Sequence, residues 1–138
     1  MILACSHLVI ATHDVAKMVH FFSNLFGIQV HFENEMFAEF VLPSRHRIAF
    51  FKPVGASAKH FHAEGERGHC AFGVTVEDVS QIHETALRLN LKVSGPPKDH
   101  PWGEKSFLLT DPDGNRWEIT QSPSPSGLLV TKGTAFLS

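Results

Sequence analysis

Two histidines occupy matching places in the two halves of this chain. His7 begins the stretch "HLVIATHDVAKMVHFFSNLFG", and His69 begins "HCAFGVTVEDVSQIHETALRLN"; in both, an apolar run passes through an aspartate into a helical pattern. Glu118 lies in a third apolar stretch, "NRWEITQ". Two imidazoles and one carboxylate can bind a divalent transition metal and leave positions open for water or substrate. His7, His69 and Glu118 are therefore candidate metal ligands.

The alternation of side chains along a strand predicts that these three residues all point away from the helix-packed face of their sheets. Successive side chains of a strand point to opposite faces, and apolar residues suit the face that packs on a helix. His7, His69 and Glu118 then face the other way, where a concave sheet would form a pocket. The apolar residues that fix this assignment are Leu8, Ile10, Cys70, Phe72, Val74, Trp117 and Ile119.

Each candidate also has an ordinary structural interpretation. A histidine at the start of a strand is commonly a boundary residue with no ligand. Glu118 could be a solvated strand residue or the partner of Arg116 or Lys105. The His-Phe-His stretch at 60–62 resembles a ligand pair, but no carboxylate or cysteine pattern accompanies it, which favours an exposed loop.

Apolar spacing predicts two amphipathic helices. The first has Asp14 as its N-cap and Gly27 as its stop, and the second has Asp78 as its cap. Their buried faces are expected to hold Val15, Met18, Val19, Phe22, Leu25 and Phe26 in the first, and Val79, Ile82, Ala86 and Leu89 in the second.

The order of predicted strands and helices repeats once, as two β-α-β-β-β modules. Expected strands are residues 3–11, 28–34, 37–42, 47–52, 68–76, 91–95, 105–110 and 115–121, with loops at 53–67 and 96–104. The modules span about 3–54 and 68–121 and form a single domain, 1–121, followed by a Ser/Pro-containing tail, 122–138. The fold class is α+β: an open, curved mixed sheet, or open barrel, with the helices outside.

Composition narrows the classes of partner. The 138 residues are 43% hydrophobic and 19% charged with a net charge of −2, so nucleic acid and membranes are not expected partners. The N-terminus lacks the basic region of a signal peptide. Cys5 and Cys70 form no disulfide framework, which suits the cytoplasm, and both are expected to be buried.

Three motifs, in order, resemble the vicinal oxygen chelate superfamily over about residues 3–121. They are "SHLVIATHDVAKMVHFFSNLFG", "GHCAFGVTVEDV" and "DPDGNRWEI". This group includes glyoxalase I, bleomycin-resistance proteins, extradiol dioxygenases, fosfomycin-resistance thiol transferases and methylmalonyl-CoA epimerase. The resemblance implies one divalent ion (Fe, Mn, Zn or Ni) held by His7, His69 and Glu118, and a homodimer whose sites lie at the subunit interface.

The chain departs from the family pattern at two positions. Ala49 stands where glyoxalase I carries a glutamate that is both a ligand and a base, and Val9 stands where the fosfomycin-resistance transferases carry a catalytic threonine. The resemblance therefore assigns neither activity. Trp102, Glu39 and Ala49 are candidate pocket residues: Trp102 as a lid or as packing on the rim, and Glu39 as a base or as an outer-face residue.

Two functions follow from this pattern. The first is a metal-dependent enzyme, of lyase, isomerase, thiol transferase or dioxygenase type, that chelates a small organic substrate through two neighbouring oxygens. The alternative is a non-enzymatic protein of the bleomycin-resistance kind, in which a dimer sequesters a small molecule. A member with no chemistry ranks last.

Overall fold

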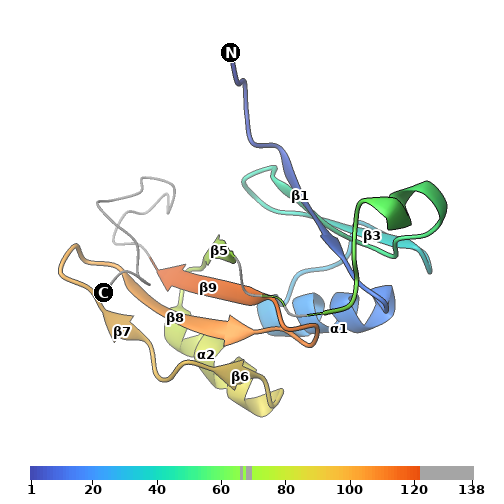
Figure 1. Cartoon of the computed structure of the whole chain (residues 1–138). Coiled ribbons are helices and arrows are strands. Elements are labelled where there is room, and N and C mark those ends of the chain that lie inside the picture. Colours follow the sequence, from blue (N-terminus) through green and yellow to red (C-terminus); the bar gives the residue numbers. More distant parts are fainter. Residues whose placement is uncertain (66, 68–69, 122–138) are drawn as a thin grey trace. The chain divides into compact units, whose positions relative to one another are not determined.

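The computed structural model describes residues 1–65, 67 and 70–121, and the chain divides into two compact units at residues 66 and 67. Figure 1 shows a helix against a small sheet in each unit. We describe each unit separately.

The first unit holds a four-stranded mixed sheet in the order β1-β4-β3-β2. Strand β1 pairs with β4 in parallel, whereas β4–β3 and β3–β2 are antiparallel. Its elements are β1 (His7–Ala11), α1 (Val15–Phe26), β2 (Phe32–Glu33), β3 (Phe37–Val41), β4 (Arg47–Phe51) and the 3-10 helix η1 (Gly55–Lys59).

The second unit repeats this plan in the order β5-β9-β8-β6, with β5–β9 parallel and a short β7 pairing with β8. Its elements are β5 (Ala71–Thr75), α2 (Val79–Arg88), β6 (Lys92–Val93), β7 (Lys98–Asp99), β8 (Lys105–Thr110) and β9 (Arg116–Gln121). Within the described residues, two α-helices and two open mixed sheets confirm the predicted α+β class built from β-α-β-β-β modules.

The helix boundaries follow the capping residues. Asp14 Oδ1 accepts a hydrogen bond from Lys17 N at 3.0 Å, and Asp78 Oδ1 accepts one from Gln81 N at 3.2 Å. Each bond satisfies an N–H that the helix itself leaves without a partner. Gly27 ends α1 with a φ of 65°, a left-handed conformation that glycine adopts without strain. All three capping predictions are confirmed.

Each helix covers one face of its own sheet. In the first unit the Phe22 ring of α1 lies 4.6 Å from the Phe40 ring and 6.0 Å from the Phe50 ring, measured between centroids. In the second unit Phe107 of β8 contacts His83 of α2 at 5.2 Å. This second core also contains the fully buried side chains of Val79, Ala86, Leu109, Trp117 and Ile119. We call the opposite face of each sheet its helix-free face.

Some sequence predictions were wrong in detail. Cys5 and Cys70 are exposed rather than buried, because both precede the strands that they were expected to join. Leu89 is 38% exposed rather than buried, and it lies just beyond the end of α2 as the C-cap residue. Residues 28–31 are not strand, and the loops expected at 53–67 and 96–104 contain η1 and β7.

A buried carboxylate organises the turn between β8 and β9. Asp111 is 4% exposed. Its Oδ1 accepts bonds from the backbone N–H groups of Asp113 and Asn115, each at 2.9 Å. Its Oδ2 accepts bonds from Asn115 Nδ2 at 2.8 Å and from Trp117 Nε1 at 2.9 Å. Four donors compensate the desolvated charge and fix the start of β9, the strand that carries Glu118.

Replacing this carboxylate will therefore destabilise the protein. Asp111→Ala leaves buried donors without their acceptor and is expected to lower the free energy of unfolding by about 3 kcal/mol or more, with Asp111→Asn in between. Urea denaturation measures the loss. Asp99→Ala is the control, because the Asp99 side chain is 84% exposed and its Oδ1 lies 3.8 Å from Lys105 Nζ. Equal stability of Asp111→Ala and Asp99→Ala would contradict this role.

Candidate functional site

Strand register places two rows of side chains across the helix-free face of the first unit. His7, Arg47 and Val41 form one row across β1, β4 and β3. One step along the strands, Val9 and Ala49 align with Glu39 in the second row. The alternate set on the same strands includes Ile10, Ile48, Phe50, Ala38 and Phe40, all buried on the helix side. His7 therefore lies on the face that side-chain parity predicted.

His7 is exposed, and its ring is held by its neighbour. Ser6 Oγ lies 2.7 Å from His7 Nδ1. In the tautomer that carries its proton on Nδ1, the ring donates this bond and Nε2 keeps a lone pair. That arrangement suits a metal-binding histidine, whose second nitrogen usually makes an orienting hydrogen bond.

Glu39 lies on the helix-free face, in register with Ala49, and its role as a base stays a prediction. Its side chain is only 18% exposed, and Oε2 lies 3.6 Å from Nη1 of Arg47, whose side chain is 46% exposed. Ala49 is 3% exposed and separates Glu39 from Val9, which is 42% exposed. Ala49 itself carries only a methyl group. The charged groups near it on this face are therefore the Glu39 carboxylate and the Arg47 guanidinium.

In the second unit Glu118 occupies the helix-free face of β9. Its neighbours Trp117 and Ile119 are fully buried on the helix side, while Glu118 is half-buried. Register aligns Glu118 with Gly73 of β5 and Leu108 of β8. A Cβ atom added at Gly73 would meet nothing within 4 Å, so this glycine leaves open space beside the carboxylate.

Trp102 belongs to a compact cluster in the turn between β7 and β8. Its indole stacks on the buried His100 ring, with centroids 4.8 Å apart, and Nε1 donates to Glu104 Oε1 at 2.6 Å. His100 Nε2 lies 2.9 Å from Ser106 Oγ, on the same face of β8 as Leu108. These contacts hold Trp102 within its turn, and its role as a lid or as packing on the rim stays a prediction.

His69 lies outside the described residues, and His7 and Glu118 belong to different units. Within residues 1–65, 67 and 70–121, no three His, Cys, Asp or Glu side chains gather closely enough to hold a metal. The ligand set of His7, His69 and Glu118 stays a prediction.

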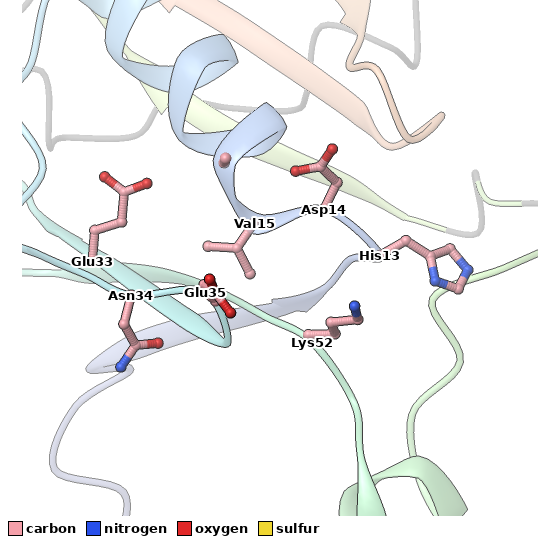
Figure 2. A pocket seen from close by; sticks show the side chains of 8 residues that line it. His13, Asp14, Val15, Glu33, Asn34, Glu35 and Lys52 are labelled. Atoms are coloured by element: carbon pink, nitrogen blue, oxygen red, sulfur yellow. The ribbon is translucent and has the colours of Figure 1, made fainter.

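Two hollows in the described part of the first unit are both lined by His13 and Lys52. One, of about 600 Å³, is also lined by Asp14 at the start of α1 and by Glu33 and Glu35; Figure 2 shows these carboxylates around it. The other, of about 510 Å³, includes His62 and Glu64. Neither hollow is lined by His7, Glu39 or Ala49.

The stretch at 60–62 is exposed as predicted. Its neighbour Glu64 does pair with a histidine, but that histidine is His13, whose Nε2 lies 3.1 Å from Glu64 Oε1.

Arg47 and His100 were not predicted as site residues from the sequence. Arg47 precedes Ala49 by two positions in "HRIAFF", so strand parity alone could have placed it on the same face. His100 precedes a Pro-Trp-Gly turn that closes the hairpin, and its burial depends on the stacking of Trp102. No local pattern in the sequence indicates that contact.

The described residues include no helix that is long and apolar enough to cross a membrane.

Solved structures share this fold at low sequence identity. A glyoxalase-related enzyme from Fulvimarina pelagi is 17% identical, with a TM-score of 0.77 over 96% of this chain and 100% of that one. Lactoylglutathione lyase from Agrobacterium tumefaciens is 19% identical, with a TM-score of 0.65 over 86% of this chain and 93% of that one. The fosfomycin resistance protein FosX from Mesorhizobium loti is 17% identical, with a TM-score of 0.65 over 94% and 100%.

At these identities the structural likeness establishes the fold and leaves the activity open. The family assignment comes from the sequence itself, because a family model matches residues 4–119, most of the chain. The chain belongs to the Glyoxalase/Bleomycin resistance protein/Dioxygenase superfamily.

Proposed function

We propose that this protein is a divalent-metal-dependent enzyme that acts on a small organic molecule through two neighbouring oxygen atoms. The observation that carries the proposal is the position of the candidate ligands. His7 and Glu118 each occupy the helix-free face of their own sheet, in a chain that the family model matches from residue 4 to residue 119. His69 completes the proposed set.

The donor types and their surroundings fit a metal. The hydrogen bond between Ser6 Oγ and His7 Nδ1, at 2.7 Å, orients the ring so that Nε2 can bind an ion. The side chain of Glu118 is half-buried, and the absence of a side chain at Gly73 leaves room for ligands next to it. A bound divalent ion would supply Lewis acidity, which stabilises negative charge on a substrate oxygen.

The chain's own residues would then bind and orient the substrate. Glu39 is a carboxylate on the helix-free face with only 18% of its side chain exposed, next to Ala49 in the strand register. Within the first unit we assign proton transfer to Glu39. Its carboxylate would take the place of the glutamate that glyoxalase I carries at the position of Ala49. Isomerase, lyase, thiol transfer and oxygen-inserting reactions all remain within this proposal.

A second candidate function is sequestration of an apolar small molecule without chemistry. It is favoured by apolar side chains exposed on the helix-free face of the first unit, namely Val9, Val41 and Phe32. Exposed apolar surface of this kind commonly marks a binding site. Sequestration does not require His7, His69 or Glu118 to bind an ion, so metal content separates the two functions.

Metal analysis of protein purified without chelators will test the proposed ligand set. Wild type is expected to hold about one divalent ion per site. The variants His7→Ala, His69→Ala and Glu118→Gln should each bind the ion at least tenfold more weakly, because each removes one of three donors. His20→Ala is the matched control, since His20 is exposed on α1. Wild type that stays metal-free after reconstitution with iron, manganese, zinc and nickel would favour sequestration.

We further propose that the protein is a homodimer in which His7 of one subunit completes a site with His69 and Glu118 of the other. Sedimentation equilibrium should then give twice the chain mass. A mixed dimer of His7→Ala and Glu118→Gln subunits should recover one metal site, because the unaltered His7 and the unaltered Glu118 meet in a single interface. Recovery of no site would show that each chain builds its own.

The proposed location is the cytoplasm. Cys5 and Cys70 are both exposed and unpaired with one another, and exposed free thiols persist in a reducing compartment.

A further inference from the structure

Arg47 lies where it could select the charge of the substrate. Register places it directly beside His7, on the adjacent strand and the same face of the sheet. Neighbouring strands are about 4.8 Å apart, so the two side chains rise from adjacent backbone positions. A molecule bound at His7 would therefore lie within reach of the guanidinium.

The surroundings of Arg47 leave its guanidinium available. Its side chain is 46% exposed, and its Nη1 forms an ion pair with Glu39 Oε2 at 3.6 Å. That distance is longer than a charge-assisted hydrogen bond, which is about 2.7–2.9 Å. Guanidinium has five N–H donors, and one loose contact leaves most of them free to bind a ligand.

Glu39 gives this arginine a defined position. Its carboxylate is largely buried, with 18% of its side chain exposed, and it lies one strand away from Ala49. The ion pair favours conformations of Arg47 in which the guanidinium lies near Glu39, which lowers the entropy that ligand binding would cost.

We propose that Arg47 is a specificity-determining residue that binds a carboxylate group of the substrate. The substrate class is then a small organic acid that has two metal-chelating oxygens and a separate carboxylate. Arginine suits this role because its planar fork matches a carboxylate with two parallel hydrogen bonds. This inference rests on the proposed function, because it places the chelating oxygens of the same substrate at His7.

A matched pair of hydroxamates tests the inference. Succinic monohydroxamic acid and butyrohydroxamic acid share the same chelating group, and one ends in a carboxylate where the other ends in a methyl group. Titration calorimetry on metal-loaded wild type should show the carboxylate compound binding at least tenfold more tightly. In Arg47→Gln this preference should fall to within about twofold, while affinity for butyrohydroxamic acid stays unchanged.

Arg45→Gln is the control for net charge. Arg45 is an exposed residue of the turn before β4, and this variant loses the same charge near the same strand. It should keep the tenfold preference. Equal binding of the two hydroxamates to wild type, or an undiminished preference in Arg47→Gln, would overturn the inference. A purely structural role for the Arg47–Glu39 pair predicts a change in stability with no change in this ratio.

A metal-free experiment separates this inference from the proposed function. The side-chain Nε–H signal of Arg47 should shift in the NMR spectrum of metal-free protein on addition of succinic monohydroxamic acid, and not with butyrohydroxamic acid. If the signal shifts in a protein that binds no metal even after loading, the carboxylate-binding role of Arg47 stands and the proposed metal-dependent function fails. If the signal does not shift but the loaded protein binds metal normally, the proposed function stands and the role of Arg47 fails.

Discussion

The register of each strand against its helix decides which side chains can meet a ligand. In the first unit Phe50 packs on the Phe22 ring of α1, and this burial forces its neighbour Ala49 onto the opposite face. A slip of one residue would expose the aromatic core and bury the charged row that contains Arg47. Burial of several phenylalanines is worth about 2 kcal/mol or more each, so the core holds the helix-free face in one arrangement.

Strand register also decides which side chains face away from the helix in the second unit, where a hydrogen bond supports the buried ring. Trp117 fixes the orientation of β9 through its buried ring and through its Nε1 bond to Asp111. Glu118, the next residue, must then face away from α2. A family whose members differ widely in chemistry can thus keep one scaffold, because the substitutions that change activity lie on the face that the core does not use.

Most of the fold could be predicted from the sequence because its signals are local. The cap at Asp14, the glycine at position 27 and the period of apolar residues in α1 all act within a few residues. The errors arose where tertiary contacts decide. A strand forms only where a partner strand supplies hydrogen bonds, and therefore β2 is shorter and β7 exists within an expected loop.

The candidate site was predictable in part for the same reason. Parity gives the face of His7 and Glu118, since it needs only alternation and the identity of the buried residues. It does not give the neighbours across strands, because pairing between β3 and β4 brings Glu39 beside Ala49 through a register that no local pattern specifies. The loose ion pair with Arg47 follows from that register and could not be foreseen.

Anomalous diffraction from crystals of metal-loaded protein tests the central claim most directly. Data collected on either side of the metal absorption edge should give one peak per site, about 2.0–2.2 Å from imidazole nitrogens of His7 and His69 and from a carboxylate oxygen of Glu118. An anomalous peak in fully loaded protein that lies beside other side chains, away from these three residues, would contradict the account.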